Sequence, residues 1–69
     1  SEKSMRVNDT FIEDTDNQEL LDIIDEELDV SFRSDYLRVR HGAYVPKPRR
    51  RQIIEEICHI LKEHGYEEG

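Results

Sequence analysis

Apolar residues recur with a helical period in two stretches of this 69-residue chain, and the first stretch covers residues 16–29. Leucines and isoleucines lie three or four positions apart there, so they form one stripe of a helix and leave carboxylates on the opposite side. Two capping boxes, Thr15 with Gln18 and Asp16 with Glu19, precede the stripe. The pattern predicts an amphipathic helix over residues 16–29 with an acidic outer face. This face consists of Asp22, Asp25, Glu26 and Asp29.

The second stretch with a helical period covers residues 48–64. Pro48 is well suited to the first turn of a helix, where its missing N–H group costs no hydrogen bond. Gly65 is a typical residue for ending a helix, and Tyr66 can then fold back on Leu61. We therefore expect a second helix over residues 48–64. Its apolar stripe consists of Ile53, Ile54, Ile57, Cys58, Ile60 and Leu61.

Between the two helices the pattern changes to an alternation of apolar and polar positions, which is typical of β-strands. Residues 30–32 alternate, and residues 36–40 alternate again before the dipeptide His41-Gly42. This dipeptide fits a two-residue hairpin turn because glycine adopts positive φ angles freely. The sequence therefore predicts an antiparallel β-ribbon over about residues 30–46. In this register Leu37, Val39 and Tyr44 share one face of the ribbon, and Tyr36, Arg38 and Arg40 share the other.

These elements predict an α+β fold in which two amphipathic helices pack on the apolar face of a small antiparallel β-ribbon. Residues 15–66 form the expected single domain. Residues 1–14 are polar with scattered apolar positions, so we expect a tail there or an edge strand near residues 6–12. Residues 67–69 are expected to fray.

Length and composition limit the class of protein. A chain of 69 residues forms one domain, whose core is close to the lower limit of what holds a chain folded without disulfides, metals or a second subunit. The single cysteine, Cys58, cannot form an internal disulfide, which fits a reducing compartment. No window approaches the roughly eighteen apolar residues of a membrane span. We therefore expect an intracellular protein, cytoplasmic or nuclear, without membrane contact.

Charge is segregated along the chain, which carries a net charge of −7. Residues 1–35 have a net charge of −9 and residues 52–69 a net charge of −4, whereas residues 36–51 carry +6 and no carboxylate side chain. A positive segment between two negative ones either pairs with its own chain or offers itself to an external anion. The basic residues of this segment are Arg38, Arg40, Lys47, Arg49, Arg50 and Arg51.

Both uses are predicted, for different arginines. Arg50 falls within the apolar stripe of the second helix and Glu27 within the edge of the stripe of the first, so we predict a salt bridge between them. The other basic residues lie on one ribbon face or near the start of the second helix, where free backbone N–H groups also attract anions. Together with an aromatic residue they predict a partner-binding strip that can follow a phosphate backbone. The strip consists of Tyr36, Arg38, Arg40, Lys47, Arg49 and Arg51.

Metal and catalytic chemistry find little support in the sequence. The acidic helix face lacks the loop that Ca²⁺ sites need. No Gly-rich phosphate loop is present, and local spacing places no base beside a serine or beside Cys58. We therefore expect no metal, no cofactor and no enzymatic activity. The zinc-type ligands, of which no two share a useful spacing, are His41, Cys58, His59 and His64.

The sequence thus predicts a small non-enzymatic regulatory binding module. In the favoured interpretation the basic strip docks an anionic partner, with nucleic acid slightly favoured over an acidic protein surface. In the alternative interpretation the chain is a protein–protein interaction module or a homodimer, in which the basic strip of one subunit meets the acidic helix of another.

Overall fold

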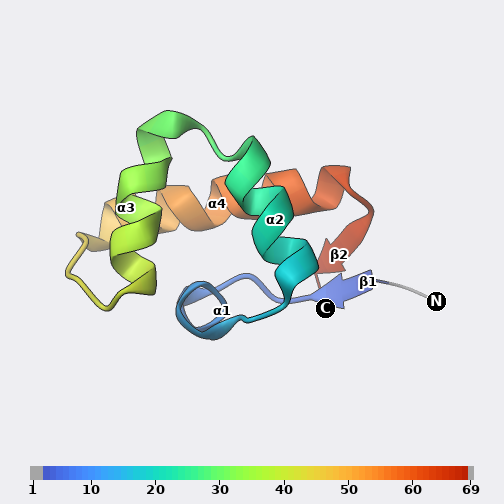
Figure 1. The fold of residues 1–69 in the computed structure, drawn as a ribbon, viewed down its shortest axis with the longest axis horizontal. Coiled ribbons are helices and arrows are strands. Elements are labelled where there is room, and N and C mark those ends of the chain that lie inside the picture. The colour runs from blue at the N-terminus through green and yellow to red at the C-terminus, as the bar shows by residue number, and fades with distance from the viewer. Residues whose placement is uncertain (1–2, 69) are drawn as a thin grey trace.

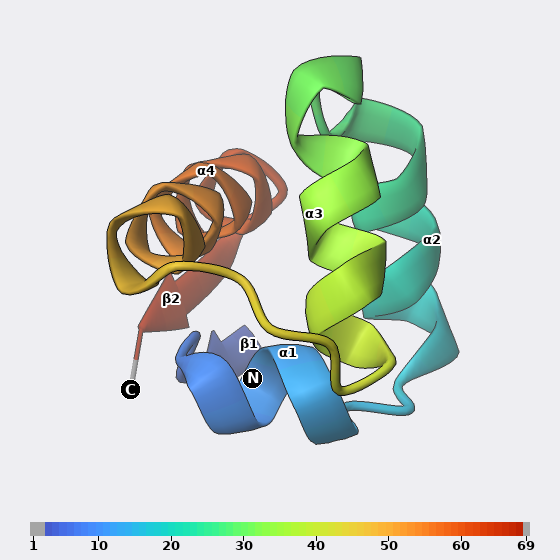
Figure 2. The ribbon, with the colours of Figure 1, turned by 90° about the vertical axis from the view of Figure 1, so that its left-hand side faces the viewer.

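The computed structural model describes residues 3–68, and within them four helices follow one another with a short strand near each end. Figure 1 shows α2 and α3 side by side, with α4 crossing behind both. Figure 2 shows the same arrangement from the side, where α4 forms one layer, α2 and α3 form the other, and α1 lies below. In chain order the elements are β1 (Lys3–Met5), α1 (Asp9–Asp14), α2 (Gln18–Glu27), α3 (Val30–Arg40), α4 (Lys47–Glu63) and β2 (Tyr66–Glu68).

The core forms where the two layers meet. α4 contributes three of its most buried side chains at intervals of four residues, which places them on one face of that helix. Burying an isoleucine or leucine side chain contributes about 1.5–3 kcal/mol, so this face holds the layers together. The side chains that are at most 1% exposed are Ile12, Ile24, Ile53, Ile57 and Leu61.

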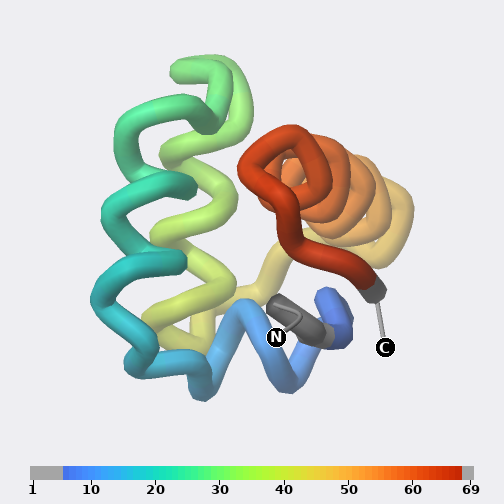
Figure 3. Tube along the Cα trace, turned by 90° about the vertical axis from the view of Figure 1, so that its right-hand side faces the viewer, coloured from blue at the N-terminus to red at the C-terminus, as the bar shows by residue number. Residues whose placement is uncertain are grey.

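The two strands pair in parallel and bring the two ends of the described chain together. Figure 3 shows the red segment after α4 turning back towards the blue start of α1. Parallel strands need a long crossover connection, and here all four helices form it. Gly65, with a φ angle of +92°, turns the chain from α4 into β2. The side chain of Tyr66 at the start of β2 is only 7% exposed, so this end of the chain is part of the core.

The antiparallel ribbon predicted over residues 30–46 is wrong, and so is the predicted α+β class, because this segment forms α3 and a loop. Phe32, Tyr36 and Val39 occupy positions i, i+4 and i+7, so they line one face of a helix. Tyr36 and Val39 are buried, and Phe32 packs against the core. The predicted ribbon faces are therefore wrong as well: Tyr36 points inward, and Leu37 is 46% exposed.

The dipeptide His41-Gly42 ends α3 and does not form a hairpin turn. Gly42 has a φ angle of +80°, and its N–H donates to the carbonyl of Val39 at 3.1 Å. The N–H of Ala43 donates to the carbonyl of Arg38 at 2.9 Å. This pair of hydrogen bonds is the Schellman motif, which satisfies carbonyls that the last turn of a helix leaves without partners.

The helices predicted over residues 16–29 and 48–64 are present as α2 and α4. The cap of α2 is Asn17, whose side chain accepts hydrogen bonds from the N–H groups of Glu19 at 3.0 Å and Leu20 at 3.4 Å. α2 ends at Glu27, before the predicted residue 29, because Asp29 caps α3 and accepts a hydrogen bond from the N–H of Ser31.

The two ends of the described chain contain structure where the sequence predicts little. Residues 1–14 are predicted as a tail or an edge strand near residues 6–12. Of the described residues among them, 3–5 form β1 and 9–14 form α1, and Val7 and Ile12 are buried. The side chain of Asn8 caps α1 by accepting a hydrogen bond from the N–H of Phe11 at 2.8 Å. Residues 67 and 68, which were expected to fray, belong to β2, and residue 69 lies outside the described residues.

Candidate functional site

Arg40, predicted for the partner-binding strip, makes its hydrogen bonds inside the fold. It lies on the side of α3 that packs against α1, and its Nη1 donates to the carbonyl oxygens of Ile12 at 3.0 Å and Thr15 at 2.8 Å. A helix leaves its last carbonyls without partners and carries partial negative charge at that end. The guanidinium of Arg40 therefore stabilises the C-terminal end of α1.

Arg49, predicted for the same strip, joins α4 to α3. Its Nε donates to Oδ2 of Asp35 at 2.8 Å, and its Nη2 donates to the carbonyl of Ser31 at 2.6 Å. The guanidinium carbon also lies 4.4 Å from the centre of the Phe32 ring. This side chain has a charge partner and a stacking partner within the fold, so it is poorly placed for an external anion.

The salt bridge predicted between Arg50 and Glu27 is wrong, because each residue pairs with a different partner. Nη1 of Arg50 lies 3.6 Å from Oδ2 of Asp9 at the start of α1. Glu27 contacts Nε2 of His64 instead, which links α2 to the C-terminal end of α4. Arg50 is half-buried as its place in the apolar stripe predicts, but the helix that approaches it is α1.

The remaining three basic residues of residues 36–51 are exposed around one loop. Arg38, Lys47 and Arg51 form no ion pair with a carboxylate in the part of the chain that the structure describes. Nη2 of Arg38 donates to the carbonyl of Tyr44 at 3.4 Å, and the Tyr44 side chain is 78% exposed. Lys47 begins α4 and Arg51 follows one turn later, about 6 Å along the helix axis. We call Arg38, Tyr44, Lys47 and Arg51 the loop cluster.

Lys47 and Arg51 stand between two surface hollows. One hollow, of about 280 Å³, extends towards the start of α1. Asp9, the carboxylate in the lining of this hollow, pairs with Arg50. The other hollow, of about 300 Å³, continues along α4 to Glu55. A partner lying on the loop cluster therefore has space on both sides of these two cations.

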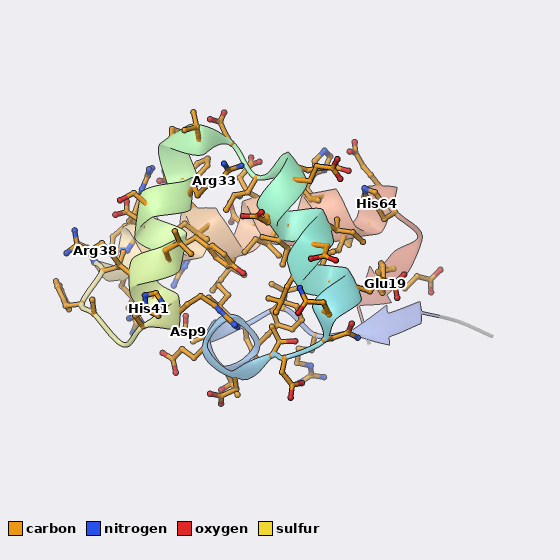
Figure 4. All side chains as sticks on the ribbon, in the orientation of Figure 1. Asp9, Glu19, Arg33, Arg38, His41 and His64 are labelled. Atoms are coloured by element: carbon orange, nitrogen blue, oxygen red, sulfur yellow. The ribbon has the colours of Figure 1, made fainter. Side chains whose placement is uncertain are left out.

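The loop cluster lies at one end of the molecule. Figure 4 places Arg38 and His41 at this end, where α3 turns into the loop. Glu19 and His64 lie at the opposite end, near β2.

The aromatic residue beside the cations is Tyr44 and not Tyr36, which was predicted for the strip. Tyr36 is 6% exposed, and burial raises the pKa of its hydroxyl. The predicted ribbon placed Tyr44 on one face with Leu37 and Val39 and so concealed its position. The signal for it was present in the sequence, because His41-Gly42 repeats the helix-ending dipeptide of residues 64–65 and places Tyr44 in a loop.

Three residues of the predicted acidic face, Asp22, Asp25 and Glu26, are exposed on α2, whereas Asp29 lies beyond its end and caps α3. Asp22 accepts a hydrogen bond from Nε2 of Gln18 at 2.8 Å, while Glu26 is exposed. Asp22 and Asp25 border a hollow of about 220 Å³ between α2 and α3. Its apolar lining includes Leu37, so this hollow combines carboxylates with an exposed aliphatic side chain.

The residues with metal-binding side chains make other contacts. His41 is the C-terminal cap of α3, Cys58 packs against the core, and His59 lies 3.2 Å from Glu63 one turn later. Within residues 3–68 no group of three or more histidine, cysteine, aspartate or glutamate residues is arranged to hold a metal ion. None of the described helices has both the length and the apolar surface needed to cross a membrane.

No protein-family model, no curated protein and no solved structure matches this chain. The basis for a function is therefore the chemistry of the exposed side chains described above.

Proposed function

We propose that this chain is a small non-enzymatic regulatory binding module whose loop cluster docks nucleic acid. One observation carries the proposal: the fold uses Arg40, Arg49 and Arg50 internally and leaves the three cations of the loop cluster exposed together, without a carboxylate partner among the described residues. The chain as a whole is strongly acidic, so carboxylates are abundant, yet these cations remain available for an external anion.

The start of α4 supports an anionic partner. Pro46 occupies the N-terminal cap position and makes no side-chain hydrogen bond there. Lys47 follows at the first helical position, where a positive charge is unfavourable by about 0.3–1 kcal/mol because the helix dipole is positive at the same end. A phosphate group bound at this position offsets both effects.

Fluorescence anisotropy with labelled oligonucleotides of about 12 nucleotides tests the proposal. Three phosphate contacts predict that the logarithm of the association constant falls with the logarithm of the salt concentration with a slope of about −2 for a single strand and −3 for a duplex. The affinity should therefore decrease roughly 20- to 40-fold between about 50 and 200 mM salt. Replacing both Lys47→Ala and Arg51→Ala should reduce the slope to about −1 or less. Lys62→Ala is the matched control, because Lys62 is an exposed lysine at the other end of α4.

The absence of binding at low salt would contradict the proposal, and so would a double variant that binds like the unchanged chain.

The hollow between α2 and α3, with Asp22 and Asp25 beside Leu37, favours a second function, in which the loop cluster of one copy docks on this acidic surface of another copy or of a different protein. Light scattering at the same two salt concentrations distinguishes the two functions. A mass that rises with protein concentration at low salt, and does so less in the double variant, would favour self-association.

A further inference from the structure

Tyr44 is the one tyrosine that the described part of the chain exposes. Its side chain is 78% exposed, whereas Tyr36 and Tyr66 are 6% and 7% exposed. A single exposed apolar residue is common on protein surfaces and has no meaning alone. Two further observations indicate a binding role for Tyr44, namely its neighbouring cations and the fixed backbone of its loop.

The loop over residues 42–46 is fixed on both sides of Tyr44. Before it, the N–H of Ala43 donates to the carbonyl of Arg38 at 2.9 Å. After it, Val45 is only 3% exposed and belongs to the core. The carbonyl of Tyr44 accepts the hydrogen bond from the Arg38 guanidinium. The backbone is therefore held in place while the ring faces solvent, so a planar group can stack on the ring with little loss of loop freedom.

The cations of the loop cluster lie within reach of this ring. Arg38 bonds to the Tyr44 backbone itself, and the Cα atom of Lys47, three residues later, lies at most about 11 Å from that of Tyr44. Arg51 extends the series by one helical turn. An exposed aromatic ring beside cations that follow a backbone is the combination with which proteins bind single-stranded nucleic acid.

The hollow between α2 and α3 is unfavourable for a duplex. Asp22 and Asp25 of α2 line it together with Leu37 and Arg40 of α3, the helix that carries Arg38. A duplex lying across α3 would bring phosphates close to these carboxylates. The bases of a duplex are also stacked on one another, so they offer no free face to a tyrosine ring away from the ends.

We propose that the loop cluster binds single-stranded nucleic acid, with one base stacked on the ring of Tyr44 and the adjacent phosphates on Arg38, Lys47 and Arg51. This inference rests on the proposed function and specifies its ligand. The exposed side chains distinguish single strands from duplexes but not DNA from RNA, because stacking and phosphate contacts are common to both.

The test compares the unchanged chain with Tyr44→Ala and Tyr44→Phe, using anisotropy at low salt. The probes are oligonucleotides of about 12 nucleotides: oligo(dT), oligo(rU), and the duplex of oligo(dT) with oligo(dA). Tyr44→Ala should weaken single-strand binding by about 5- to 100-fold, because base stacking is lost, and Tyr44→Phe should retain it. The duplex should bind more weakly than either single strand. Circular dichroism should show the same helical content in all three proteins, because the Tyr44 side chain is exposed.

Two results separate the failure of this inference from that of the proposed function. The stacking inference is overturned if the duplex binds as tightly as the single strands, or if Tyr44→Ala leaves the affinity for single strands unchanged. In that case the proposed function stands as long as the double variant, Lys47→Ala with Arg51→Ala, still binds more weakly than the unchanged chain. If no oligonucleotide binds at low salt, both fail. Tighter binding of oligo(dT) or of oligo(rU) supports the inference in either case and shows which of the two probes the site prefers.

Discussion

Two arginines in this chain stabilise the ends of helices other than their own. Nη2 of Arg33 donates to the carbonyls of Asp25 at 2.8 Å and Leu28 at 3.2 Å at the end of α2, and Arg40 does the same for α1. These acceptors are backbone atoms, so no side chain in the sequence marks them. The residue type predicts a positive charge correctly, but only the packing of the helices decides whether that charge faces solvent.

Replacing Arg40 by alanine should lower the free energy of unfolding by about 1–3 kcal/mol, because two carbonyls lose a charged donor in a partly buried position. Arg38→Ala is the matched control on the same helix. Arg38 is exposed and makes one long hydrogen bond, so its loss should cost about 0.5 kcal/mol or less. Urea denaturation followed by circular dichroism measures both. Equal stability of the two variants would show that Arg40 does not stabilise α1.

At the scale of elements, α3 is where the sequence admits two interpretations. Over a window as short as residues 30–40, apolar residues can satisfy both an alternation and one helical face, and the valines and aromatic residues there favour a strand. The capping residues favour a helix, with Asp29 at its start and Gly42 after its end. The helix also buries Tyr36 and Val39 in the common core, which a separate ribbon would do less completely.

Gly42→Ala should destabilise the chain by about 1 kcal/mol, which corresponds to a decrease in Tm of about 4–8 °C for a domain of this size. The cost comes from the backbone, because Gly42 has a φ angle of +80° and an added Cβ would meet no atom within 4 Å. Gly42→Asn should cost less, since asparagine tolerates positive φ angles better than alanine. Thermal unfolding of the two variants measures the difference. A Tm that is unchanged in Gly42→Ala would count against the Schellman motif at this position.

At the scale of the whole molecule, tyrosines from two separate elements are buried in one core. Burial raises the pKa of the Tyr36 hydroxyl in α3, and burial together with the nearby Glu19 carboxylate raises the pKa of Tyr66 in β2. The folded state therefore holds these protons more tightly than the unfolded chain, whose tyrosines have an ordinary pKa of 10.0. The resulting stabilisation is complete below that pH and is lost as the pH rises through the folded-state pKa values.

The free energy of unfolding should accordingly decline above about pH 10. Tyr36→Phe removes one of the groups responsible, so the decline should be shallower in this variant. Urea denaturation at a series of pH values, with the folded state checked by circular dichroism at each, measures the effect. The same decline in Tyr36→Phe as in the unchanged chain would show that ionisation of Tyr36 does not oppose folding.

The parts of the fold that follow from the sequence are those set by local spacing. The periods and end signals of residues 16–29 and 48–64 predict α2 and α4, and Gly65 predicts the end of α4. Each of these depends on residues a few positions apart, which the sequence displays directly. The charge segregation along the chain is likewise a property of the sequence.

Tertiary packing decided what local spacing left open. It selected the helix over the strand for α3, joined the two ends of the chain as parallel strands, and paired Arg50 with Asp9. It also determined the candidate site by turning Arg40 towards carbonyls 25 and 28 residues away and leaving Tyr44 exposed. The physical reason is that burial and hydrogen bonding between distant segments compete with local preferences of about 1 kcal/mol or less per residue, and in this small core they win.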